Sequence, residues 1–231
     1  MSLVTIRGHL GSGAPEVGRQ VADALHIDYI DREIIAKVAE LLDEQSQDII
    51  AKEMPPGSLW ERIARAFGFD NVAGSFYAVE PGFLAPYSGA YLPAWQIPLD
   101  DTQYLSGLES VINELARDQN VVIRGRGSQF ILKNNPAALH VLIIAPLEIR
   151  VKRIMDDLKK DKEGAKKEIS HSDNSRRAFV KRYFQADMDD PEHYDLVINT
   201  AHFNYEQAAS IIIKTLVLKD RTEGSRQGSG G

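Results

Sequence analysis

The sequence predicts an α/β protein in three layers, with a five-stranded parallel sheet covered by helices on both faces. Short apolar runs rich in Val and Ile alternate along the chain with segments whose apolar residues recur at helical spacing. This alternation is typical of parallel strands joined by right-handed crossovers, which are covered on both faces. We find no internal repeat, and 231 residues are enough for one sizeable core.

The composition is that of an ordinary globular protein from a reducing compartment. Hydrophobic residues make up 43% and charged residues 26% of the chain. There is no cysteine, which excludes a disulfide framework, a thiolate metal site and a cysteine nucleophile. A strand begins within a few residues of the N-terminus in place of a signal peptide, and no apolar run approaches a membrane span. We therefore expect a cytoplasmic protein without a membrane partner.

The net charge of -6 argues against general binding of nucleic acids. The charge is uneven, because residues 150–182 carry 12 Lys or Arg and 6 Asp or Glu. This segment is therefore +6 and the remainder of the chain is -12. The basic segment either receives an anionic ligand or forms a solvated helix face with paired charges, and a charge run alone favours the second.

The first predicted element is a buried strand that runs into a glycine-rich loop. The spacing Gly8-x4-Gly13 matches the first two fixed positions of a phosphate-binding loop. Helical spacing follows over residues 17–25, and Pro15 suits the first turn of that helix. Backbone N–H groups at such a turn, together with the partial positive charge of a helix N-terminus, bind anions. The predicted binding residues are Gly11, Ser12, Gly13 and Ala14.

A short strand over 27–30, ending at Asp31, and an amphipathic helix over 34–42 precede a segment with no stable period. Residues 53–103 contain one candidate helix at 58–67 and then a stretch rich in Gly, Pro and aromatic residues at 69–98. A long irregular segment is typical of a substrate-covering loop or an insertion, and its aromatic residues argue against full disorder. They either pack against the body, which is favoured, or stack a base, or form a dimer contact.

The second half of the chain returns to alternating helices and strands. We expect helices over 103–118, from 148 onward, over 173–187 and over 205–218, strands over 120–123, 138–144 and 194–200, and a disordered tail over 220–231. The strand at 120–123 enters a second glycine turn that contains Arg126. Such turns lie at the carboxyl ends of parallel strands, where open α/β sheets bind ligands.

These pieces, in this order, resemble the P-loop nucleoside monophosphate kinases, and most closely the cytidylate kinase-like family. The resemblance rests on motifs at residues 11–18, 29–35, 122–126, 140–150 and 190–200. It implies a P-loop kinase fold in a single domain over residues 1–219, with a helical lid at 159–190. It covers residues 53–103 poorly, and these are expected to form an acceptor-side insertion.

The resemblance implies that ATP, with Mg²⁺, donates its γ-phosphate to a nucleoside monophosphate such as CMP. Arg126 resembles the arginine that holds the acceptor phosphate, and Arg176, Arg177 and Arg182 resemble lid arginines that close over the phosphates. Planar guanidinium groups suit bidentate phosphate contacts. Asp31 would either orient the acceptor sugar or base, or a metal-bound water, or it would cap the helix after it. The six histidines show no metal-ligand spacing, so no metal site of side chains is expected.

The chain departs from the phosphate-loop pattern at two positions. Ala14 replaces the usual lysine, and Pro15 replaces the hydroxyl residue that usually binds Mg²⁺. Arg19 either reaches back to the loop or lies on the helix surface. The alternative function is therefore a non-catalytic nucleotide-binding or regulatory protein on the same fold. A nicotinamide-dinucleotide enzyme is excluded, because Glu16 stands where that motif has glycine. A homodimer is compatible with the sequence.

Overall fold

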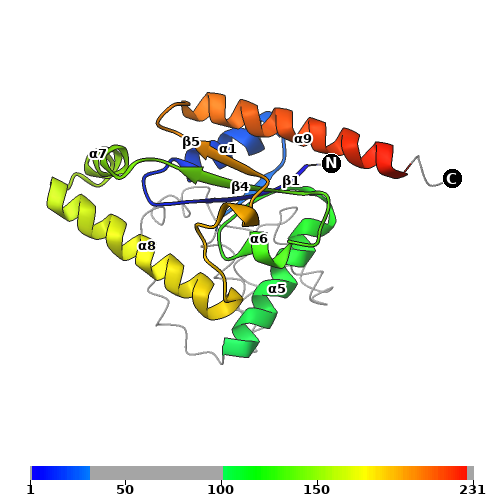
Figure 1. Cartoon of the computed structure of the whole chain (residues 1–231), viewed down its shortest axis with the longest axis horizontal. Helices are drawn as coiled ribbons and strands as arrows, with labels where there is room; N and C mark the ends of the chain where they lie inside the picture. The colour runs from blue at the N-terminus through cyan, green and yellow to red at the C-terminus, as the bar shows by residue number, and fades with distance from the viewer. Residues whose placement is uncertain (1, 32–100, 228–231) are drawn as a thin grey trace, which may run out of the picture. The chain divides into compact units, whose positions relative to one another are not determined.

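A computed structural model of the chain describes residues 2–31 and 101–227 (Figure 1). The chain divides into two compact units, Met1–Arg32 with Asp118–Gly231, and Glu33–Arg117. The described part of the second unit is helix α5 (Asp101–Arg117), which confirms the helix expected over 103–118. The helix expected over 34–42 and the segment 53–100 lie outside the described residues.

The first unit is built on a parallel sheet of five strands. They are β1 (Ser2–Gly8), β2 (Asp28–Ile30), β3 (Asn120–Arg124), β4 (Ala138–Ile144) and β5 (Leu196–Asn199). Their spatial order is β2-β3-β1-β4-β5, so β1 lies at the centre with Thr5 paired to Ile123 on one side and His140 on the other. The predicted five-stranded parallel sheet is confirmed, and the carboxyl ends of all its strands share one edge.

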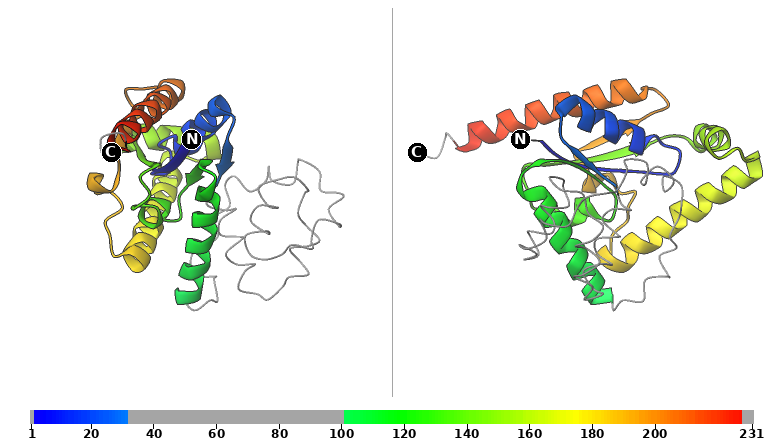
Figure 2. Two further views of the ribbon diagram at one scale, coloured as in Figure 1. Left: turned by 90° about the vertical axis from the view of Figure 1, so that its right-hand side faces the viewer. Right: turned by 180° about the vertical axis from the view of Figure 1, so that it is seen from behind.

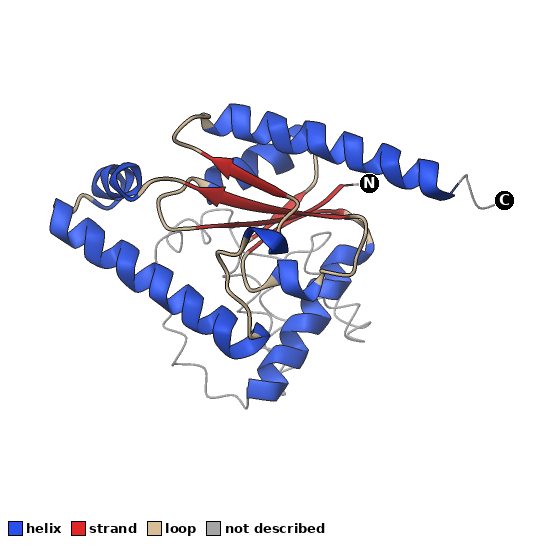
Figure 3. Cartoon of the chain, viewed as in Figure 1, coloured by secondary structure: helices blue, strands red, loops and turns tan. Residues whose placement is uncertain are grey.

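Helices cover both faces of this sheet (Figures 2 and 3). Helices α1 (Ala14–Leu25) and α9 (Tyr205–Gln227) lie on one face, and α6 (Ser128–Ile131) and α8 (Lys162–Phe184) lie on the other. Helix α7 (Leu147–Leu158) packs against α8, and a short 3-10 helix (Pro191–His193) precedes β5. Over the described ranges, no helix has both the length and the apolar character needed to cross a bilayer.

Two helices run further than the sequence predicts. Helix α8 begins at Lys162, well before the expected start at 173, because the Asp161 carboxylate caps it by accepting the N–H of Gly164 at 2.8 Å. Helix α9 continues to Gln227, past the expected end at 218, through a polar segment that contains helix-favouring Arg, Glu and Gln residues. Residues 228–231 of the expected tail lie outside the described residues, and the single domain over 1–219 stays a prediction.

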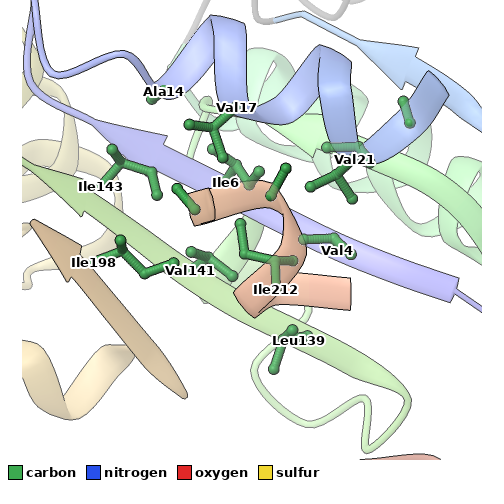
Figure 4. Close-up of a cluster of buried hydrophobic side chains, with 14 of the residues drawn as sticks. Val4, Ile6, Ala14, Val17, Val21, Leu139, Val141, Ile143, Ile198 and Ile212 are labelled. Carbon is green, nitrogen blue, oxygen red and sulfur yellow. The ribbon is translucent and has the colours of Figure 1, made fainter. Parts of the chain in front are cut away.

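The main hydrophobic core lies between the sheet and the helix pair α1 and α9 (Figure 4). Successive strand residues point to opposite faces, so Val4 and Ile6 of β1 enter this core with Val141 of β4, while Thr5 and Arg7 face the other side. Burying each such aliphatic side chain contributes about 1.5–3 kcal/mol. The core therefore fixes β1, and with it the start of the loop that follows β1.

On the opposite face of the sheet, a buried polar pair joins β1 to β4. The Thr5 Oγ1 and His140 Nδ1 atoms are 2.8 Å apart, and His140 is 9% exposed. Burial lowers the pKa of His140 from its ordinary value of 6.5. The Asp195 carboxylate opposes that shift, and the Lys219 ammonium adds to it.

We predict that the protein loses stability between about pH 7.5 and about pH 5.5, because the unfolded chain takes up a proton at residue 140 that the folded chain resists. The stabilisation that comes from the lowered pKa of His140 is present above the ordinary histidine pKa and is lost as the pH falls below it. The measurement is urea unfolding at both pH values for the wild type and for His140→Gln, which cannot titrate. An equal pH dependence in the two proteins would contradict the prediction.

Candidate functional site

Two glycine turns lie side by side at the carboxyl edge of the sheet. Residues 9–13 join β1 to α1, and residues 125–127 join β3 to α6. Strands β1 and β3 pair in parallel, and the N–H of Gly125 donates to the carbonyl of Ile6 at 3.1 Å. The structure therefore brings together the two turns in which the sequence places the candidate binding residues.

The loop at 9–13 has a backbone path that requires glycine. Gly11 and Gly13 have φ values of 78° and 87°, in the left-handed region that disfavours other residues. A Cβ atom on Gly13 would lie 2.2 Å from Cε1 of Tyr205, the first residue of α9. Gly13 is also the N-cap of α1, so the loop enters the helix at the expected position.

The carbonyl groups of this loop, and that of Gly8 at the end of β1, are held by side chains from α7, α8 and the end of β5. Four hydrogen bonds do so: Arg176 Nη1 to Gly8 O at 2.6 Å, Arg150 Nη1 to Leu10 O at 3.4 Å, Arg153 Nη1 to Gly11 O at 3.1 Å and Thr200 Oγ1 to Ser12 O at 2.7 Å. In a trans peptide the N–H points opposite to the C=O. The N–H groups of Gly11 and Gly13 are therefore turned to the other side of the loop.

The first turn of α1 adds further donors to this loop. The first N–H groups of a helix have no acceptor within the helix, and Ala14 and Glu16 supply such groups, whereas Pro15 has no N–H. The Glu16 side chain is exposed, so its charge is largely screened by solvent. Backbone donors at a helix N-terminus fit a chain of phosphates.

The same region offers no side-chain ligand set for a metal ion. Pro15 lacks a hydroxyl group, and within residues 2–31 and 101–227 no group of three or more His, Asp or Glu residues is arranged to hold a metal. Ala14, at the motif's lysine position, is 1% exposed and belongs to the hydrophobic core. The motif's lysine position therefore supplies no charge to the loop.

Arg153 and Thr200 form a clamp on the outer side of the loop. Besides its contact with Gly11, Arg153 donates to Thr200 Oγ1 and to the Thr200 carbonyl, each at 2.9 Å. Its guanidinium lies 5.2 Å from the ring centroid of Tyr205, within cation–π distance. Sequence reasoning missed both residues of this clamp. The sequence signals that could have indicated them were weak: Thr200 ends the motif at 190–200, and Arg153 is one basic residue among many in its segment.

A second arginine is buried against α8. Arg150 donates to Asp173 Oδ2 at 2.7 Å, and Oδ1 of the same carboxylate accepts the N–H of Leu10 at 3.4 Å. Exposures of 11% and 7% for the two charged side chains make this a buried pair, which is costly to break. Part of the basic segment is therefore internal structure, and it holds α7, α8 and the loop together.

Asp189 joins a histidine and two arginines from different parts of the fold. Its Oδ1 lies 3.0 Å from His9 Nε2 and 2.9 Å from Arg7 Nη1, and its Oδ2 accepts from Arg177 Nη2 at 3.3 Å. The hydrogen bond from His9 and the charge of Arg7 hold the pKa of Asp189 well below its ordinary value, against the opposing effect of burial. The ionised carboxylate thus ties the loop to α8.

The predicted arginines occupy three different environments. Arg176 contacts the start of the loop, as described above. Arg177 is 49% exposed and points to Asp189, whereas Arg182 is exposed with its guanidinium 5.7 Å from the Tyr183 ring. Arg126 has a φ of 54° between two glycines that are also left-handed, and its guanidinium lies 5.7 Å from the ring centroid of Phe179.

Asp31 pairs with Arg124 across the ends of β2 and β3. Arg124 Nε donates to Asp31 Oδ2 at 3.0 Å, and Nη2 contacts both carboxylate oxygens. This neighbouring pair was not expected from the sequence. Arg19 is exposed and its guanidinium lies 5.4 Å from the Tyr29 ring centroid, which places it against β2 on the helix surface.

Comparisons with known proteins agree in sequence and in fold. The model of the cytidylate kinase-like family matches residues 3–202. Cytidylate kinase of Archaeoglobus fulgidus is 32% identical over 217 residues, which cover 94% of this chain and 95% of that protein. Cytidylate kinase of Methanococcus aeolicus is 29% identical over 110 residues, which cover 47% of this chain. This match spans 62% of the M. aeolicus protein, which is less than two thirds of its length.

A solved structure shows the same fold. It is an uncharacterized protein from Eubacterium ventriosum with a TM-score of 0.63 at 17% identity, and the match covers 94% of this chain and 98% of that one. The order of the strands and the family match together confirm the predicted P-loop kinase fold.

We predict that Thr200→Val lowers the free energy of unfolding by about 1–3 kcal/mol, because it removes a buried hydroxyl and leaves the Ser12 carbonyl without its donor. Thr200→Ser keeps the hydroxyl, so its free energy of unfolding should stay close to that of the wild type. Urea unfolding of the three proteins measures the difference. The prediction is wrong if the valine variant is as stable as the wild type.

Proposed function

The chain belongs to the cytidylate kinase-like family, and on that premise we propose that it transfers the γ-phosphoryl group of ATP to a nucleoside monophosphate, with CMP as the first candidate. An oxygen of the acceptor phosphate forms a bond to the γ-phosphorus. The bond between that phosphorus and the β–γ bridging oxygen breaks, and ADP leaves. The relatives from A. fulgidus and M. aeolicus are both named cytidylate kinase, and this name supports CMP as the acceptor.

The observation that carries the proposal is the backbone cradle at residues 9–13. The carbonyl groups of Leu10 and Ser12 are held by Arg150 and Thr200, so the N–H groups of Gly11 and Gly13 remain for the β- and γ-phosphates of ATP. The donors are fixed before ATP arrives. Such preorganisation is the main requirement in phosphoryl transfer, where alignment and charge neutralisation supply most of the catalysis.

The neighbouring turn would hold the acceptor phosphate. A non-glycine residue in the left-handed region costs about 1–3 kcal/mol and is typical of functional sites. Arg126 occupies that conformation at the sheet edge beside the loop, where its guanidinium can contact a phosphate through two N–H groups. The Asp31–Arg124 pair at the ends of β2 and β3 would contact the sugar or base of the acceptor.

Positive charge for the transferring group would come from α8, because position 14 has no lysine. Arg176 lies at the start of the loop, and a guanidinium carries five N–H donors, so its contact with the Gly8 carbonyl is compatible with a phosphate contact. Arg177 and Arg182 on the same helix are exposed and would approach the phosphates from the lid. ATP would bind as its Mg²⁺ complex.

A second candidate is a nucleotide-binding protein without turnover. Ala14 is buried in the core and Pro15 has neither N–H nor hydroxyl, so two groups that assist the transfer in other phosphate-binding loops are missing. This candidate predicts that ATP and CMP raise the melting temperature while no ADP forms.

We predict Mg²⁺-dependent ADP formation that requires a nucleoside monophosphate, measured in a coupled assay over the common nucleoside monophosphates. No ADP with any acceptor, combined with thermal stabilisation by nucleotides, would favour the second candidate. No ADP and no stabilisation would contradict both.

We predict that Arg126→Ala abolishes the thermal stabilisation by CMP and lowers kcat/KM by about 10²–10³-fold, because a charge contact to the acceptor phosphate is lost. The matched control is Lys166→Ala, which removes a cation on α8 that pairs with Glu163 at 3.1 Å in an exposed position. The control should behave as the wild type. Unchanged stabilisation by CMP in Arg126→Ala would remove Arg126 from the acceptor site.

A further inference from the structure

The loop at residues 9–13 carries one ionisable side chain, that of His9. The motif's lysine position holds Ala14 and the next position holds Pro15, so no cation follows the loop directly. The His9 carbonyl accepts the N–H of Ser12 at 3.0 Å, which fixes the backbone of His9 inside the turn. A charge on the His9 imidazole would therefore lie beside the backbone donors of the loop.

The imidazole of His9 contacts an ionised carboxylate. His9 Nε2 lies 3.0 Å from Asp189 Oδ1, and the two side chains are 15% and 30% exposed. The hydrogen bond from His9 and the charge of Arg7 keep the pKa of Asp189 well below its ordinary value, although burial opposes this shift. The carboxylate is therefore charged whether or not His9 carries an extra proton, and it accepts a hydrogen bond from either form of the imidazole.

Two arginines share this carboxylate with His9. Arg7 Nη1 lies 2.9 Å from Oδ1 of Asp189, and Arg177 Nη2 lies 3.3 Å from Oδ2. The two arginines and Asp189 give a net charge of +1, and a proton on His9 would raise this charge to +2. A single protonation can thus double the positive charge of the cluster that adjoins the loop.

Charges of both signs face this part of the loop from the elements packed around it. An additional anion beside the imidazole therefore shifts the balance of charges toward its protonated form. Besides Asp189, Arg7 and Arg177, these groups are Arg150 and Asp173, which pair with each other, Arg176 at the Gly8 carbonyl, and the exposed Asp187, which accepts the N–H of Asp189 at 2.9 Å.

We propose that His9 supplies the loop with charge for a triphosphate, so that the triphosphate binds together with a proton taken up by the His9 imidazole. Histidine is the side chain whose charge ordinarily changes between about pH 5 and about pH 8. A triphosphate on the N–H groups of Gly11 and Gly13 brings several negative charges near the imidazole, and these favour the imidazolium. Because the two binding events are reciprocally coupled, the triphosphate binds more tightly as the pH falls through this range. The proposal rests on the function proposed above and adds an affinity-determining residue to the same site.

The test compares the full-length wild type with His9→Gln, which keeps an N–H donor for Asp189 and cannot gain a charge. Calorimetry gives the Kd for AMP-PNP with Mg²⁺ at about pH 6 and about pH 8. Titration of AMP-PNP itself affects both proteins equally. The ratio of the Kd at the higher pH to that at the lower pH should be about 3- to 10-fold larger in the wild type, as expected for one charge in a partly solvated site.

Proton uptake gives a second measurement that a purely structural role of His9 would not change. Calorimetry at about pH 7, in two buffers of different ionisation enthalpy, counts the protons that accompany binding of AMP-PNP. The wild type should take up more protons than His9→Gln. If the glutamine variant is unstable in thermal unfolding at either pH, His9→Asn, which is also neutral, replaces it in both measurements.

The matched control is His26→Asn. His26 is exposed and ends α1 with a φ of 53°, a conformation that asparagine tolerates. The 12 residues of α1 separate it from Gly13 by about 18 Å. The control loses a histidine at the far end of the same helix, and it should keep both the pH dependence and the proton uptake of the wild type.

The possible outcomes distinguish this proposal from the proposed function. A wild type that binds AMP-PNP with the pH dependence and proton uptake of His9→Gln contradicts the role of His9 and leaves the proposed function standing. Loss of both effects in His26→Asn also contradicts the role of His9. A wild type that binds no AMP-PNP at either pH contradicts the proposed function, and the role of His9 falls with it.

Discussion

The site depends on the hydrogen bonds that hold the carbonyl groups of the loop at residues 9–13. A glycine loop alone is free to present either its carbonyl or its N–H groups to a ligand. Here Arg150 and Thr200 fix that choice for Gly11 and Gly13, because the Leu10 and Ser12 carbonyls that they engage turn the N–H of the same peptide the other way. The basic segment thus orients the backbone of this loop.

Two carboxylates lie beside this loop, and each is paired with a cation. Asp173 and Asp189 are both paired with arginines, and Asp189 also accepts from His9. Each carboxylate fixes the position of a cation or a backbone N–H group beside the loop. These pairs lie in a part-buried environment, where removing one partner leaves the other uncompensated.

The sequence was informative where a pattern is local. The strand at 138–144, the loop glycines and the glycine turn around Arg126 follow from short runs of residues, and the structure has each at the expected place. The clamp of Arg153 and Thr200 could not be predicted, since it depends on which strand ends lie beside β1. The early start of α8 was missed because charged residues without a clear apolar face give little periodic signal.

The Tyr205 ring that closes on Gly13 also sets the order in which the site can form. Thr200 and Tyr205 belong to the last strand and the last helix, and the hydrogen bond from Thr200 to Ser12 joins residues 188 positions apart. Contacts this distant in sequence form late, because the intervening chain must first be closed into a loop. During synthesis the loop at residues 9–13 is made well before residue 205, yet its geometry is completed only after residue 205 has been added.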